Sequence, residues 1–161
     1  MFFTSKRKKI AREVLDRIRP FFGTAKMTTG LPPTHFKDDA YILGFVVGAA
    51  GYIARAASKN TLANSDLGFV TIDVLEGLFG KYGVDSAQRE MQLLKQGNAP
   101  EFQRGISNGQ KTVLAGLGAV DEMTDDPDVR AALSEGDPSR VPVTLQLRLF
   151  HNYITEKYGE R

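Results

Sequence analysis

Residues 40–54 form a run of fifteen residues without a charge, nearly all of them apolar. Asp38 and Asp39 precede the run and Arg55 follows it, so acidic residues stand at the positive end of a helix dipole and a cation at its negative end. Fifteen helical residues span only about 22 Å, which is short of the roughly 30 Å hydrocarbon core of a bilayer. The run therefore predicts a buried central helix rather than a membrane span.

Glycine recurs inside this run and inside the other apolar segments. Each glycine within a helix costs roughly 0.5–1 kcal/mol relative to alanine, so close backbone packing must offset the cost. We interpret Gly44, Gly48 and Gly51 as helix-packing residues. Three occupants of this glycine row are open: another helix of the chain, a second copy in a homo-oligomer, or an apolar ligand in a glycine-lined groove.

Most of the chain shows apolar residues at helical spacing, and no segment alternates for long with the period of two that is typical of strands. With 161 residues, the chain has the length of one domain. We predict an all-α fold, a single compact bundle of six to seven helices around a glycine-rich central apolar helix. The helices are expected over residues 5–22, 38–59, 65–82, 85–96, 98–120, 127–135 and 140–158.

Proline and glycine residues at two places in the sequence predict where helices end and begin. Pro20 disfavours continuation of the first helix, and the glycines and prolines of residues 23–33 predict a connecting loop. This loop is expected to separate a basic amphipathic N-terminal helix (residues 1–26) from a helical core domain (residues 34–161). Gly83 is expected to end the third helix, and Asp85 to begin the fourth.

The composition excludes several chemistries. The chain has no cysteine and only two histidines, which rules out disulfides, thiolate metal sites, a cysteine nucleophile and a zinc site built from imidazoles. No phosphate-binding loop or nucleophile elbow is present. We interpret His35 and His151 as surface or capping residues, expect no cofactor, and find no sequence signal for catalysis.

An acidic cluster offers the one alternative to a pure binding role. Asp121, Asp125, Asp126 and Asp128 could hold a hard cation through carboxylates, and a small metal-dependent enzyme or metal-binding protein is therefore the alternative function. The cluster lacks the glycine and the bidentate glutamate of a calcium loop. Asp126 also precedes Pro127, which suits it to cap a helix.

The net charge of +2 hides an asymmetry between the N-terminus and the rest of the chain. Residues 1–26 carry eight cations and two anions, whereas the remainder carries thirteen cations and seventeen anions. The basic helix either docks on the body with its charges in water, lies on an anionic membrane surface, or binds nucleic acid or an acidic protein. Nucleic acid ranks lowest because the body is acidic and lacks interleaved aromatics. The candidate membrane- or partner-binding residues are Lys6, Arg7, Lys8, Lys9 and Arg12 with Phe2 and Phe3.

Two short motifs, Gly51-Tyr52-Ile53-Ala54-Arg55-Ala56 and Gly97-Asn98-Ala99-Pro100-Glu101-Phe102, carry a family resemblance. Over about residues 40–103 the chain resembles TerB-like helical domains, including those of membrane-anchored DnaJ-type co-chaperones. The resemblance implies an all-helical domain with a role in stress response near the inner membrane face. Many such domains carry a metal-binding acidic signature after the first apolar helix. Residues 57–60 hold no carboxylate here, so no metal site is carried over.

Together these patterns predict a non-enzymatic helical interaction or scaffold module. Its expected partner is another protein or a second copy of the chain, and an anionic membrane surface is a further candidate. We expect a cytoplasmic protein, with peripheral attachment at the inner membrane face if the basic helix binds lipid.

Overall fold

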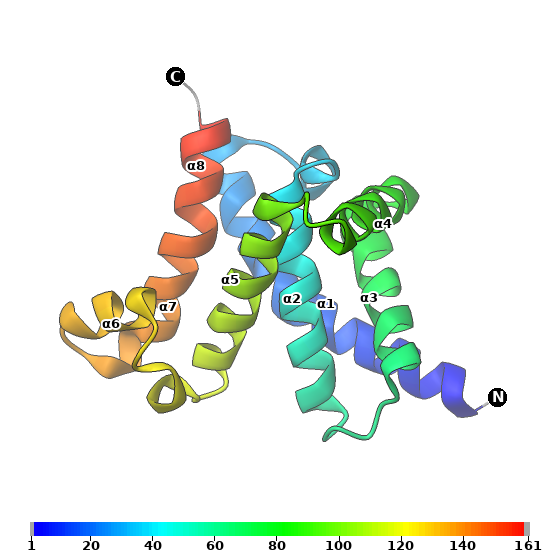
Figure 1. The fold of residues 1–161 in the computed structure, drawn as a ribbon, viewed down its shortest axis with the longest axis horizontal. Helices are drawn as coiled ribbons and strands as arrows, with labels where there is room; N and C mark the ends of the chain where they lie inside the picture. The colour runs from blue at the N-terminus through cyan, green and yellow to red at the C-terminus, as the bar shows by residue number, and fades with distance from the viewer. Residues whose placement is uncertain (1, 160–161) are drawn as a thin grey trace.

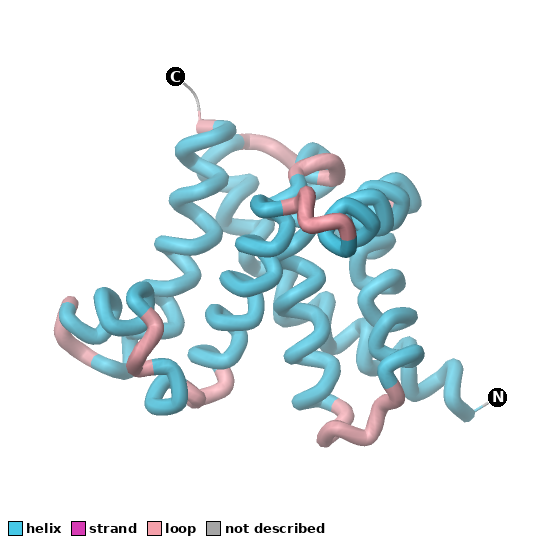
Figure 2. The backbone as a smooth tube through the Cα atoms, in the orientation of Figure 1, coloured by secondary structure: helices cyan, strands magenta, loops and turns pink. Residues whose placement is uncertain are grey.

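The computed structural model describes the backbone of residues 2–159 and the side chains of residues 6–159. Helices account for nearly all regular structure, and residues 2–159 contain no strand (Figures 1 and 2), which confirms the predicted all-α class. The helices are α1 (Phe2–Thr29), α2 (Ala40–Ala57), α3 (Asn64–Phe79), α4 (Lys81–Lys95), α5 (Pro100–Gly116), α6 (Pro127–Ser134), α7 (Val141–Gln146) and α8 (Asn152–Tyr158). Short 3-10 turns lie at Pro33–Phe36, Val120–Met123 and Pro138–Arg140. A π-helical segment, Leu147–His151, joins α7 to α8, so the three form one continuous C-terminal helix.

Helix α2 occupies the centre of the bundle (Figure 1). It is long and apolar enough to cross a bilayer, but 61% of its residues are buried inside the protein. The side chain of Asp39 caps its N-terminus by accepting a hydrogen bond from the Ile42 N–H at 2.9 Å. Its apolar character is therefore that of a core helix.

Helices α2 and α5 cross in backbone contact, because each carries two glycines at the crossing. A Cβ at Gly44 would lie 3.0 Å from the Phe102 carbonyl carbon, and the carbonyl oxygen would be closer still. A Cβ at Gly105 would lie 2.9 Å from the backbone nitrogen of Phe45. Gly48 and Gly109 are opposed in the same way by the facing backbone. The reciprocal arrangement accounts for four of the glycines inside helices.

The first helix is longer than the sequence predicted, and this is a correction. It continues through Pro20 to Thr29 instead of ending near Phe22, and Figure 1 shows it changing direction along its course. Phe22 and Ala25 are buried, and this packing holds the turns that follow the proline. The hydroxyl of Thr24 also donates to the Pro20 carbonyl at 3.2 Å.

The apolar stripe of α1 packs into the same core as the other helices. Ile10, Val14, Ile18 and Phe22 are all at most 5% exposed. The described parts of the N-terminal helix and of the expected core domain therefore share one hydrophobic core, and residues 23–29, expected as a loop, are helical.

Two further boundaries differ from the sequence prediction. Gly80, with φ +70°, ends α3, and α4 begins directly at Lys81. Gly83 and Asp85 therefore lie inside α4 rather than at the helix junction. Gly83 is required there because a Cβ would collide with the side chain of Phe79.

Helical spacing predicts that the C-terminal helix buries Val143, Leu147, Phe150, Ile154 and Tyr158. Phe150 and Ile154 are buried, but the first half of the helix turns another face to the core. Val143 and Leu147 are 60% and 49% exposed, while Leu145 and Leu149 are buried. His151, expected at the surface, is buried at 7% exposure. The π segment bonds the Asn152 N–H to the Leu147 carbonyl, five residues apart, and this wider turn shifts the buried face.

Candidate functional site

The cations of the N-terminal helix divide into two groups. Lys6 donates to the Thr61 hydroxyl at 3.1 Å, and the guanidinium of Arg7 lies 3.3 Å from Asp73 and over the Phe69 ring, 5.1 Å from its centroid. These contacts tie α1 to α3 and to the turn before it.

Lys8, Lys9 and Arg12 are exposed and form no ion pair within the described part of the chain. Phe2 and Phe3, the expected aromatic anchors, have side chains that lie outside those described. Because the apolar stripe of α1 faces the core, the exposed surface of this helix is mainly charged.

The acidic cluster is organised around a lysine. The ammonium of Lys111 lies 2.8 Å from Asp126 and 2.6 Å from Asp128. Burial would lower the pKa of Lys111, but the hydrogen bonds to these two carboxylates outweigh it and raise that pKa. Asp126 also caps α6, as expected, by accepting from the N–H groups of Asp128 and Val129.

The other members of the cluster lie apart from this pair. Asp121 and Asp125 are exposed on the turns before α6. Among the described residues, no group of three acidic, histidine or cysteine side chains is placed to hold a metal ion. The cation that pairs with both Asp126 and Asp128 in this fold is the ammonium of Lys111, which offsets one of their two negative charges.

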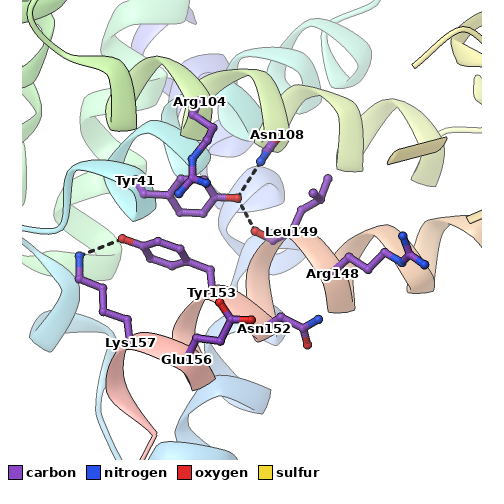
Figure 3. A pocket seen from close by; sticks show the side chains of 9 residues that line it. All are labelled: Tyr41, Arg104, Asn108, Arg148, Leu149, Asn152, Tyr153, Glu156 and Lys157. Atoms are coloured by element: carbon purple, nitrogen blue, oxygen red, sulfur yellow. Dashed lines mark hydrogen bonds between the residues drawn. The ribbon is translucent and has the colours of Figure 1, made fainter. Parts of the chain in front are cut away.

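A polar pocket of about 420 Å³ opens between α2, α5 and the C-terminal helix (Figure 3). The rings of Tyr41 and Tyr153 stack with centroids 4.1 Å apart, and Arg104 lies over Tyr41 at 4.8 Å. The Tyr41 hydroxyl donates to the Leu149 carbonyl and accepts from the Asn108 amide at 2.9 Å. Burial raises the pKa of Tyr41, so its hydroxyl keeps its proton at neutral pH.

Each cation lining this pocket already has an anionic partner in the chain. Arg104 lies 2.7 Å from Glu101, Arg148 is paired with Glu135, and Lys157 lies 2.8 Å from Asp39. Figure 3 shows Arg148 directed away from the two tyrosines. The polar groups of the pocket therefore hold the C-terminal helix onto α2 and α5.

A second hollow is larger and less polar than this pocket. Two adjoining cavities of about 440 Å³ and 480 Å³ lie between α2, α3, α4 and α5, and they share Val47, Gly68, Thr71 and Met91. We call the two together the α2–α4 cleft. Its further lining residues are Gly48, Gly51, Tyr52, Arg55, Asn64, Leu67, Ile72, Leu75, Val84, Ala87, Gln88, Gln92, Lys95, Ile106 and Gln110.

Two glycines within helices line this cleft without a packing partner. A Cβ at Gly51 of α2 or at Gly68 of α3 would meet no heavy atom of the described chain within 4 Å. No helix among the described residues comes within 4 Å of a Cβ at Gly51, unlike at Gly44 and Gly48 of the same row. The sequence contains the signal for the cleft, a helical glycine on each wall, but separating open from packed glycines requires the positions of the other helices.

The cleft is also nearly free of charge. Arg55 and Lys95 are its charged lining residues, and both are cations. Met91, 39% exposed, lies at the junction of the two cavities and presents a flexible apolar side chain. The remaining polar lining groups are uncharged amides and hydroxyls.

Comparison of the chain with family models, with curated proteins and with solved structures finds no match in any of the three.

Proposed function

We propose that this protein is a non-enzymatic interaction module that binds a protein partner in the α2–α4 cleft. The observation that carries the proposal is the pair of helical glycines, Gly51 and Gly68, that face open space across the cleft. Glycine destabilises a helix interior, and no contact within the described chain offsets the cost at these two positions. Gly23 of α1 is open in the same way, so what distinguishes Gly51 and Gly68 is that they line one cavity together. A partner that approaches the backbone closely would supply the missing contact.

The lining supports a protein rather than a catalytic substrate. Val47, Leu75, Val84 and Met91 present apolar surface, and the described lining of the cleft has no histidine or carboxylate to act as an acid, a base or a metal ligand. Apolar grooves between helices commonly receive an amphipathic helix from a partner.

Site-specific photocrosslinking tests this function. A photoreactive benzoylphenylalanine replaces Met91 in the full chain, and the crosslinked segment is identified by mass spectrometry in cells that make the protein. We expect an adduct to a segment of another protein that is lost in Gly51→Leu and Gly68→Leu. Gly23→Leu is the matched control, because Gly23 also lies in a helix with open space at its Cβ but outside the cleft.

Two results would overturn the proposal. One is an adduct of equal yield in the leucine variants. The other is an adduct to a second copy of this chain, which would assign the cleft to a homo-oligomer. Circular dichroism of each variant, measured alongside, separates loss of the fold from loss of binding.

A second candidate, an electrostatic contact with an anionic membrane, is favoured by the exposed Lys8, Lys9 and Arg12. Because the stripe of α1 is buried, such binding would rest on charge and weaken with salt. Cosedimentation with vesicles containing phosphatidylserine should then fall when all three are changed to glutamine. Equal pelleting of the wild type and the triple variant would contradict it.

A further inference from the structure

The partner of the cleft can be specified further, on the basis of the proposed function. We infer that the occupant is an α-helix with small residues at its point of closest approach and acidic residues on its flanks. Its small residues would pack on Gly51 and Gly68, and its carboxylates would pair with Arg55 and Lys95.

The first argument is the course of the glycine row on α2. Gly44, Gly48 and Gly51 lie on one face of the helix, because spacings of four and three residues return to the same side. Helix α5 covers the first two at backbone contact distance and leaves the third open. Figure 1 shows α2 and α5 diverging toward the C-terminal end of α2. The glycine face of α2 therefore extends beyond the part that α5 covers.

The second argument is the opposite wall. Gly68 lies in the first half of α3 and lines both cavities of the cleft. Glycines on two facing helices remove the side chains that would hold a third helix away. Backbone approach of this kind already occurs in this molecule at the crossing of α2 and α5, where Gly48 and Gly109 allow it.

The third argument is charge. Arg55 is exposed near the C-terminal end of α2, and Lys95 is exposed at the C-terminal end of α4. Neither cation forms an ion pair with a described carboxylate. Since no acidic residue lines the cleft, an acidic partner gains attraction without repulsion, whereas a basic one is disfavoured.

The contact can be dissected with two designed helical peptides. Both carry the same alanine- and leucine-rich apolar face, with glutamates on the flanks of one and lysines on the flanks of the other. Binding to the full-length protein is followed by fluorescence anisotropy. We expect the glutamate peptide to bind at least about tenfold more tightly than the lysine peptide, a ratio that corresponds to roughly 1.4 kcal/mol.

Variants then assign the contact to the cleft. Arg55→Glu with Lys95→Glu should reverse the preference between the peptides, while Arg89→Glu, on the exposed surface of α4 outside the cleft, should leave it unchanged. Gly51→Leu should weaken both peptides, and Gly23→Leu neither.

The outcomes separate this inference from the function on which it rests. Equal affinities for the two peptides would overturn the inference that the partner helix is flanked by acidic residues. So would a preference for the glutamate peptide that persists in Arg55→Glu with Lys95→Glu. Glycine-dependent crosslinking at position 91 would still support a partner in the cleft after that result. Crosslinking at position 91 that does not depend on Gly51 and Gly68 would overturn both the acid-flanked helix and the proposed binding of a partner in the cleft.

Discussion

The hydroxyl of Tyr158 donates a hydrogen bond of 2.6 Å to the carboxylate of Asp39 and so joins the last turn of α8 to the start of the central helix. The same carboxylate accepts from Lys157 at 2.8 Å, from the Tyr153 hydroxyl and from the Ile42 N–H. With a side chain only 1% exposed, Asp39 is a buried charge that four donors satisfy.

Replacement of Asp39 by alanine should therefore destabilise the protein substantially. The change removes a helix cap and leaves the two tyrosine hydroxyls and Lys157 without their acceptor, for an expected loss of about 3 kcal/mol in the free energy of unfolding. Urea denaturation followed by circular dichroism measures it. Asp38→Ala is the neighbouring control, since Asp38 is exposed and should cost under about 1 kcal/mol. Equal losses in the two variants would contradict the role given to Asp39.

The same carboxylate should make stability depend on pH in acid. Burial would raise the pKa of Asp39, but the hydrogen bonds from Lys157 and Tyr158 outweigh it and hold that pKa below the ordinary value. Its contribution is present above about pH 4, the pKa of the unfolded chain, and is lost as the pH falls through the lower folded value. Unfolding free energies between pH 6 and 2 should fall more steeply in the wild type than in Asp39→Asn. Parallel curves for the two proteins would show that Asp39 is not the source of the acid dependence of stability.

His151 should add a separate step nearer neutrality. Burial lowers the pKa of His151, and its Nδ1 has no hydrogen-bond partner among the described residues. The fold favours the neutral ring of His151. Its contribution to the free energy of unfolding is therefore present above the unfolded pKa of about 6.5 and is lost as the pH falls below that value. Thermal melts of wild type and His151→Gln between pH 7.5 and 5 should converge as the pH falls. A constant difference would show that His151 does not titrate with unfolding.

Two alanine substitutions in α2 should act in opposite directions. Gly44→Ala places a Cβ against the Phe102 carbonyl and should cost about 1–3 kcal/mol. Gly51→Ala places one in open space and should stabilise the helix by roughly 0.5–1 kcal/mol. Urea denaturation of the two variants gives the comparison. A destabilised Gly51→Ala would mean that the cleft is closed in solution.

Divalent metal should leave the fold unaffected, because Lys111 already occupies the space between Asp126 and Asp128 and no third described carboxylate joins them. Differential scanning calorimetry with millimolar Mg²⁺, Mn²⁺ or Ca²⁺ should show an unchanged Tm at constant ionic strength. A rise in Tm that disappears in the double variant Asp125→Ala/Asp126→Ala would instead support the metal-dependent alternative.

Local signals in the sequence predicted the elements well. Helical periodicity indicated the all-α class, and Asp126 before Pro127 indicated the start of α6, because periodicity and capping involve residues within one turn of each other. The predictions failed at helix boundaries that depend on contacts with residues distant in the sequence. Helix α1 continues past Pro20 because Phe22 packs into the core. Gly83 lies inside α4 because the side chain of Phe79 leaves no room for a Cβ there.

The candidate sites show the same division. The sequence indicated exposed cations on the first helix, but it could not show that Arg7 contacts Asp73 of α3 while Lys8 and Lys9 point to solvent. Nor could it show that Lys111 lies against the acidic cluster, since the pair forms only when α5 and α6 meet.

Helical periodicity and the charge-free run at residues 40–54 are sufficient to predict a bundle of helices around a glycine-bearing central helix. Which of those glycines are packed and which are open depends on contacts between helices, and these are visible only in the folded protein. A glycine at 44 and a glycine at 51 have the same local preferences. The difference between them is whether the backbone of α5 arrives within contact distance, and that distance depends on how the helices cross.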